Sequence, residues 1–115
     1  MPRANIDLRP RVIVGDARAM GPGKADLLDQ IIKCGSISAA AKAMNMSYSR
    51  AWQLVDAMNK AFKKPVVESA TGGAKGGGAQ VTEVGRAVLS HYREMQTALD
   101  AKASEHVSGF QKYLK

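Results

Sequence analysis

The chain has 115 residues, 45% of them hydrophobic, which is enough to bury one core and too few for two. No apolar run approaches the roughly 20 residues that cross a bilayer, and the only cysteine, Cys34, excludes an internal disulfide. Lysines and arginines outnumber aspartates and glutamates by 17 to 10, and 12 of the basic residues lie within residues 1–82 beside only 6 acidic ones. We therefore predict a single cytoplasmic domain over residues 1–115, with no membrane contact, whose basic surface either meets a polyanion or simply keeps the protein soluble.

Residues 1–21 predict one strand followed by a loop. The stretch IDLRPRVIVG roughly alternates apolar and polar side chains, as a strand with one buried face does. The stretch GDARAMGPG, which ends this segment, carries the glycines and the proline that are typical of loops.

A first helix is predicted from Pro22 onward. Apolar side chains recur there at spacings of three and four residues: Ala25, Leu28, Ile31 and Ile32. We expect Asp26 and Asp29 near the start of this helix, where its dipole favours acidic side chains. Gly35 suits the left-handed residue at its end.

Two more helices joined by a tight turn are predicted from GSISAAAKAMNMSYSRAWQLVDAMNKAFKK, so that residues 22–64 hold three helices. Ser36 or Ser38 can cap the short helix and Ser47 the longer one, while Asn45 tolerates the left-handed conformation of the turn. The apolar stripe of the longer helix comprises Ala51, Leu54, Val55, Met58 and Phe62. We expect Trp52, beside this stripe, to lie in the core. The pattern is that of a helix-turn-helix, although an ordinary helical hairpin within a bundle has the same outline.

A β-hairpin with a glycine-rich tip is predicted over residues 65–82. Pro65 ends the preceding helix, and the strand-favouring runs VVES and AQVT flank the glycine stretch. A phosphate-binding P-loop needs a serine or threonine after its lysine and then a helix, whereas Lys75 is followed by Gly76 and a strand. The dinucleotide-binding fingerprint also requires a helix after its glycines. The glycines therefore predict the tip of a hairpin, which is a wing.

Residues 83–115 predict a long C-terminal helix capped by Thr82. Four apolar side chains form its seam: Val88, Tyr92, Met95 and Leu99. Val107, Phe110 and Leu114 extend the pattern, although Gly109 weakens the last turns. The seam can pack on the first helix of the same chain, on a second copy, or on both. We predict a homodimer, because the seam is long for so small a core.

Several of these motifs together resemble the N-terminal DNA-binding domain of the ModE family of molybdenum-responsive transcriptional regulators. They are GSISAAAKAMNMSYSRAW, MNKAF, PVVESATGGAKGGGAQVTEVGRAVLSHY and the preceding LLDQIIKCG, and they cover roughly residues 6–95. The resemblance implies a winged helix-turn-helix, more distantly similar to the LysR-type regulators. ModE proteins that sense molybdate bind it on C-terminal oxyanion-binding modules, and this chain ends about where those modules would begin. The resemblance therefore implies DNA binding and not molybdate binding.

The start of the second helix of a helix-turn-helix enters the major groove of DNA. In this chain that end carries Ser47, Tyr48, Ser49, Arg50 and Gln53. Arg50 can pair with both acceptors of guanine or clamp a phosphate, and Gln53 can bond both edge groups of adenine. Tyr48 offers a hydroxyl to a phosphate or an apolar face to a thymine methyl group, whereas Ser47 is foremost a cap.

The wing is expected to contact the sugar-phosphate backbone. Its glycines let the main chain approach DNA without side-chain collision. Lys75 supplies a charge for a phosphate, and Thr71 supplies a hydroxyl donor.

The sequence thus predicts a mainly α fold with a small β-hairpin, a winged helix-turn-helix with a long C-terminal helix. The predicted function is a sequence-specific transcriptional regulator that binds double-stranded DNA at an inverted-repeat operator. We expect no enzyme activity, cofactor or metal site, because His91 and His106 have no third ligand at metal spacing and no catalytic arrangement is recognisable. The alternative is a protein-interaction or oxyanion-sensing module that retains the winged fold and docks its last helix on a partner.

Overall fold

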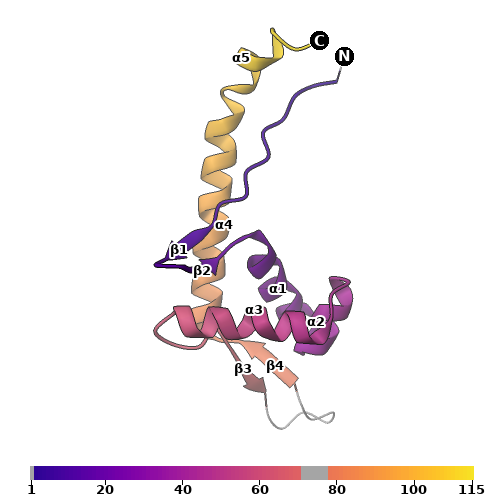
Figure 1. Cartoon of the computed structure of the whole chain (residues 1–115), viewed down its shortest axis with the longest axis vertical. Coiled ribbons are helices and arrows are strands. Elements are labelled where there is room, and N and C mark those ends of the chain that lie inside the picture. Colours follow the sequence, from indigo (N-terminus) through magenta and orange to yellow (C-terminus); the bar gives the residue numbers. More distant parts are fainter. Residues whose placement is uncertain (1, 71–77) are drawn as a thin grey trace.

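The computed structural model describes residues 2–70 and 78–115 (Figure 1). Its elements follow one another as β1 (Val12–Val14), β2 (Ala17–Met20), α1 (Pro22–Cys34), α2 (Ile37–Ala43), α3 (Tyr48–Ala61), β3 (Val67–Ala70), β4 (Gly78–Val81), α4 (Glu83–Ser104) and α5 (Val107–Gln111). Helices α1, α2 and α3 form a head, from which α4 extends so that the molecule measures 58 × 30 × 22 Å. Within the described residues, no helix combines the length and the apolar character that crossing a bilayer requires.

Local sequence signals set the helix ends as predicted. Ser36, Ser47 and Thr82 cap α2, α3 and α4, and each side chain accepts a hydrogen bond of 3.0 Å from the backbone N–H three residues later. Gly35 ends α1 with a φ of 77°, and Asn45 turns the chain between α2 and α3 with a φ of 54°. Glycine and asparagine tolerate this left-handed conformation best. These side chains explain why α2, the turn and α3 form the predicted helix-turn-helix.

The core lies between the three helices of the head and the base of the β3–β4 hairpin. Its largest fully buried side chains are Met20, Leu27, Leu28, Ile31, Met58, Val55 and Val66. Where α2 meets α3, the buried side chains are the small Ala40, Ala41 and Ala51. Because these side chains are short, the two helix backbones can approach each other closely.

The β3–β4 hairpin is the predicted wing, and hydrogen bonds fasten its base to the head. Its two strands pair antiparallel. The Ala79 N–H donates to the Gly35 carbonyl at the end of α1, with a distance of 2.9 Å. Thr82 closes the other side, because its N–H donates to the Val66 carbonyl at 2.9 Å and its hydroxyl to the Pro65 carbonyl at 2.7 Å.

The N-terminal segment differs from the prediction of one strand and a loop. It forms an antiparallel pair, β1 and β2, in which Val14 lies opposite Ala17. Gly15 has a φ of 59° in the connection, and glycine followed by aspartate is a pair that two-residue hairpin turns favour. Residues assigned to the loop therefore supply a second strand, and the described part of the chain has two small hairpins where one was predicted.

The C-terminal helix is interrupted, whereas the sequence predicted one helix over residues 83–115. Helix α4 ends at Ser104, and α5 begins at Val107. After the break, α5 contacts the N-terminal arm, which is the segment of residues 2–11 before β1: the Gln111 Oε1 accepts a hydrogen bond of 2.6 Å from the Ala4 N–H. Val107 is buried at this contact.

Polar contacts hold α4 against α1 and the N-terminal arm. The Arg93 guanidinium pairs with Asp26 at 2.9 Å and with Asp29 at 2.5 Å. Both acids lie beyond the first turn of α1, so they hold α4 instead of offsetting the helix dipole as predicted. Tyr92 is buried, and its hydroxyl donates to the Pro10 carbonyl at 2.6 Å. Tyr92 therefore packs inside its own protomer, which is one of the alternatives predicted for the seam, and its place between two copies stays a prediction.

Gly85 lies in the first turn of α4, directly against the hairpin. It is buried, and a Cβ atom built on it would overlap the Val66 carbonyl oxygen and come within 2.7 Å of the Val81 Cγ1. Since the first of these atoms belongs to the backbone, a side chain at position 85 can be accepted only if α4 or the backbone at Val66 moves.

Gly85→Ala is expected to lower the free energy of unfolding by about 1–3 kcal/mol, because the added methyl group overpacks the junction of α4 and the hairpin. Urea denaturation followed by circular dichroism measures the change. Gly23→Ala in α1 is the matched control: that position has open space around it, and the substitution is expected to stabilise the helix by roughly 0.5–1 kcal/mol. A neutral effect of Gly85→Ala would contradict the close packing.

Candidate nucleic-acid interface

Helix α3 has one buried face and one exposed face. Ala51, Val55 and Met58 are buried at spacings of four and three residues, which is the period of a helix. Leu54 is half-buried beside them, and the exposed side chains of the first turns are polar or aromatic: Tyr48, Ser49, Arg50, Trp52, Gln53 and Asp56. The start of α3 therefore presents donors, acceptors and aromatic faces to solvent.

The residues predicted on the recognition helix lie together at this start. Four of them are exposed side chains of α3, namely Tyr48, Ser49, Arg50 and Gln53. The fifth, Ser47, uses its hydroxyl as the cap, accepting from the Arg50 N–H at 3.0 Å. The two predicted wing contacts, Thr71 and Lys75, lie outside the described residues.

Trp52 belongs to the exposed surface, and the prediction that it lies in the core is wrong. Its side chain is 45% exposed. Ala51, Val55 and Met58 fill the core without it, and residue 52 projects about 100° around the helix from residue 51. With Tyr48, Trp52 lines a cavity of about 560 Å³ between α3 and the wing strands. The flank of α3 that faces the wing is therefore aromatic.

Asn59 positions the wing relative to α3. Its amide nitrogen donates to the Val67 carbonyl at 3.0 Å, and its Oδ1 accepts from the N–H groups of Val66 and Val67 at 2.8 and 3.3 Å. One side chain thus satisfies three backbone groups where β3 begins. The sequence pattern assigns Asn59 no role, and its only signal is a polar residue at the edge of the apolar stripe.

On its other flank, α3 meets basic side chains from the N-terminal hairpin and from the residues on either side of it. Arg9, Arg11, Arg18 and Lys24, which form the hairpin cluster, line a cavity of about 210 Å³ together with Arg50. The Lys24 Nζ donates to the Arg18 carbonyl at 2.7 Å. Burial, and then the charges of Arg18 and Arg50, lower the pKa of Lys24. Sequence reasoning missed this cluster, because only the packing of β2 against α3 brings residues so far apart in the chain together.

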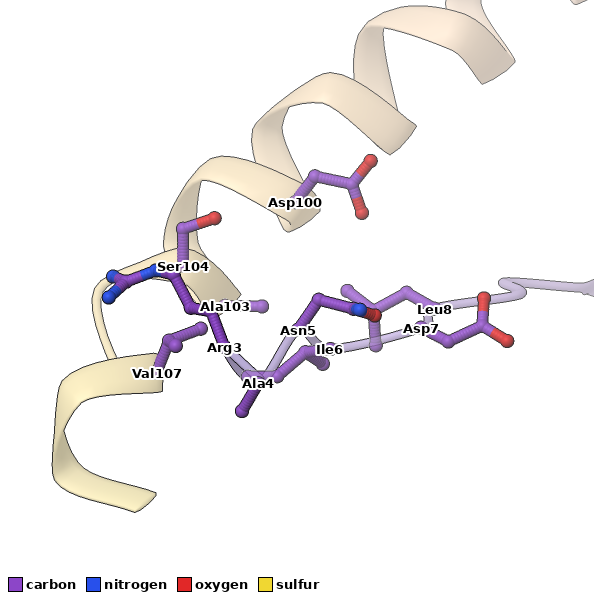
Figure 2. A pocket seen from close by; sticks show the side chains of 10 residues that line it. All are labelled: Arg3, Ala4, Asn5, Ile6, Asp7, Leu8, Asp100, Ala103, Ser104 and Val107. Carbon is purple, nitrogen blue, oxygen red and sulfur yellow. The ribbon is translucent and has the colours of Figure 1, made fainter. Parts of the chain in front are cut away.

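A larger cavity, of about 690 Å³, lies away from α3, between the N-terminal arm and the end of α4 (Figure 2). Its charged side chains are Arg3, Asp7 and Asp100. Figure 2 shows them pointing in different directions instead of toward a common centre. In residues 2–70 and 78–115, no three His, Cys, Asp or Glu side chains are grouped so that they could hold a metal ion. The geometry therefore favours the surface around α3 over this cavity as the functional site.

Comparison with known proteins agrees with this assignment. Residues 24–86 match the model of the bacterial regulatory helix-turn-helix protein, lysR family. The chain is 39% identical over 83 residues to the molybdenum-pterin-binding protein MopA of Rhodobacter capsulatus. The aligned region covers 72% of this chain and 31% of MopA. It is 37% identical over 87 residues to the DNA-binding transcriptional dual regulator ModE of Escherichia coli K12, and this alignment covers 76% of this chain and 33% of that ModE. The chain thus spans about a third of the length of these relatives.

Solved structures share the fold. The crystal structure of the CbnR_DBD–DNA complex aligns with a TM-score of 0.59 at 16% identity, over 76% of this chain and 94% of that one. The full-length LTTR LysG from Corynebacterium glutamicum aligns with a TM-score of 0.57 at 27% identity, over 83% of this chain and 31% of the LysG chain. The family match begins after β1 and β2, so it includes α3 and the wing but not the N-terminal hairpin.

Asn59→Ala is expected to lower the free energy of unfolding by about 1–3 kcal/mol, because it leaves backbone groups of Val66 and Val67 without their partner. Equilibrium urea denaturation measures the loss. Lys60→Ala, one residue later, removes only a surface ion pair with Asp56 and is expected to have a much smaller effect. Equal losses in the two variants would show that the Asn59 amide does not hold the wing.

Proposed function

The chain belongs to the LysR family of bacterial regulatory helix-turn-helix proteins, and we propose on this basis that it binds double-stranded DNA with sequence preference and regulates transcription. The observation that carries the proposal is the exposed start of α3, whose polar side chains lie over a buried stripe. In helix-turn-helix proteins this end of the second helix enters the major groove. The net charge of +7 favours association with DNA. Such a regulator works where the DNA is, so the proposal places it in the cytoplasm.

In this proposal, Arg50 and Gln53 recognise bases. A guanidinium can donate to both acceptors on the guanine edge, and a carboxamide can pair with both groups on the adenine edge. Tyr48 and Ser49, on the same exposed surface, bind phosphates or base edges through their hydroxyl groups. Trp52, which the structure adds to this surface, offers an indole N–H donor and an apolar face.

The wing supplies contacts that do not depend on sequence. Lys75 binds a phosphate, and Thr71 donates a hydroxyl to the same backbone. The support for this comes from the sequence of the glycine stretch and from Asn59, which holds the base of β3 beside α3.

The protein acts as a homodimer through the seam of α4. Val88 and Met95 line an apolar groove of about 420 Å³, and Leu99, one turn beyond, is 40% exposed. Tyr92 supports this surface from within its own protomer. A second copy that covers these side chains removes apolar area from water. Two-fold symmetry then pairs two recognition helices with an inverted repeat whose half-sites lie about 10 base pairs apart or a multiple of that.

Arg50→Ala is expected to weaken binding by about 1–3 kcal/mol and to relax base preference at one position of each half-site, because one bidentate base contact is lost. Selection of bound duplexes from a random pool identifies the preferred site, and fluorescence polarisation measures the affinities. Unchanged affinity and preference would remove Arg50 from base recognition.

Lys75→Ala is the contrasting variant in this experiment. Loss of one phosphate contact is expected to weaken all duplexes alike and to reduce the slope of log K against log salt by about 0.9. Base preference is expected to remain that of the wild type.

Leu99→Glu is expected to raise the dissociation constant of the dimer by about tenfold or more, because it places an unpaired carboxylate in the apolar seam. Sedimentation velocity over a concentration series measures the change. Thr97→Glu adds the same charge on the opposite, exposed face of α4 and is expected to leave the dimer intact. A monomeric wild type, or equal effects of the two variants, would contradict the proposed interface.

A further inference from the structure

The hairpin cluster gathers positive charge beside the recognition helix. Arg9, Arg11, Arg18 and Lys24 line one cavity with Arg50. Among the ion pairs formed within the described residues, the only one to include any of these five joins Arg9 to Asp7 at 3.3 Å, and both are exposed. Like charges held together repel one another, and the lowered pKa of Lys24 reflects burial first and then this repulsion. A bound anion offsets such repulsion.

The cluster lies on the flank of α3 that faces away from the wing. Figure 1 shows β1 and β2 on one side of α3 and β3 and β4 on the other. The cavities agree, since Tyr48 and Trp52 line the one beside the wing strands and Arg50 lines the one beside β2. Ser49 and Gln53 project between these two flanks. The exposed ridge of α3 therefore runs between two hairpins.

The shape of B-DNA places a sugar-phosphate backbone beside each of the two flanks of α3. The major groove is about 12 Å wide and admits one helix, and a sugar-phosphate backbone borders it on each side. A helix seated in the groove has one backbone on its wing side and the other on the side of the hairpin cluster. Arginine and lysine side chains are common partners of DNA phosphates.

We propose that the hairpin cluster is a second phosphate-binding element, in which Arg11 directly before β1, Arg18 of β2 and Lys24 of α1 hold the backbone on the border of the major groove opposite the wing. The proposal rests on the proposed function, because it needs α3 in the groove. Three of the four cluster residues precede residue 24, outside the segment that matches the LysR family model. All three arginines are exposed, which suits a continuous backbone better than a small ligand that carries a phosphate.

The test compares two variants of the full chain that lose the same charge. Arg11→Gln with Arg18→Gln removes two positive charges from the hairpin cluster, and Lys112→Gln with Lys115→Gln removes two from the exposed C-terminal end. Fluorescence polarisation with the selected duplex, from about 50 to about 200 mM salt, gives the affinity and its salt slope. Circular dichroism melting checks that both variants are folded.

The hairpin variant is expected to bind on the order of tenfold more weakly, with a salt slope smaller by about 1.8, which corresponds to two phosphate contacts at about 0.9 each. The C-terminal variant is expected to stay within about twofold of the wild type, with the same slope. Base preference is expected to be unchanged in both. Equal behaviour of the two variants overturns the proposal and leaves the proposed function standing, whereas a wild type that binds no duplex overturns both.

Phosphate ethylation interference tests the same contact in the wild-type protein, whatever the stability of the hairpin variant. Each half-site is expected to show two groups of sensitive phosphates, one on each border of the groove. A single group, on the wing side only, overturns the proposal.

Inorganic phosphate tests the other source of the same ligand chemistry. It is titrated by NMR at constant ionic strength, and no saturable binding at the hairpin cluster is expected. Saturable binding there, together with DNA binding by the hairpin variant equal to that of the C-terminal variant, assigns the cluster to a small anion and overturns the proposal.

Discussion

The narrow stripe that α3 buries decides what the protein shows to a partner. Ala51, Val55 and Met58 are the side chains of α3 that are fully buried in the core, with the half-buried Leu54 and Phe62 packed beside them, and the small Ala51 lets α2 come close. Because the stripe is narrow, most of the circumference of α3 stays free. Polar and aromatic side chains can therefore occupy its first turns without weakening the core. A wider stripe that included Trp52 would bury the flank that now faces the wing.

Two hairpins extend this surface, and different physics holds each in place. The wing is held by directed hydrogen bonds, which run from Asn59 to the start of β3 and from the Thr82 hydroxyl to the Pro65 carbonyl. Close approach at Gly85 then fixes the start of α4 against the same hairpin. The N-terminal hairpin is held by burial of Met20 in the core, while Arg18 within it and Arg9 and Arg11 before it remain exposed. The hydrogen bonds hold the wing in position beside α3. The N-terminal hairpin brings Arg18 close to Arg50 and the other basic side chains of the hairpin cluster.

Most of the fold could be predicted from the sequence, but less of the site. Ser36, Ser47 and Thr82 mark their helix ends through contacts within three residues, so a short window of sequence contains the whole interaction. The size and apolar character of Trp52 predict that it lies in the core. The helical spacing of Ala51, Val55 and Met58, however, places residue 52 outside the buried stripe. Asn59 shows only a polar residue at the edge of the apolar stripe, and the sequence does not reveal its role because its partners lie across a turn, at the start of another element.

The sequence by itself determined the capped starts of α2, α3 and α4, the end of α1 at Gly35, the turn at Asn45, and the exposure of Arg50 and Gln53, because these depend on backbone hydrogen bonds and on helical period over a few residues. Only the tertiary structure decided that Arg50 stands among Arg11, Arg18 and Lys24, and that Tyr92 is buried against the arm at Pro10. Such contacts join residues distant in the chain. They follow from how the elements fill space together, which no short window of sequence specifies.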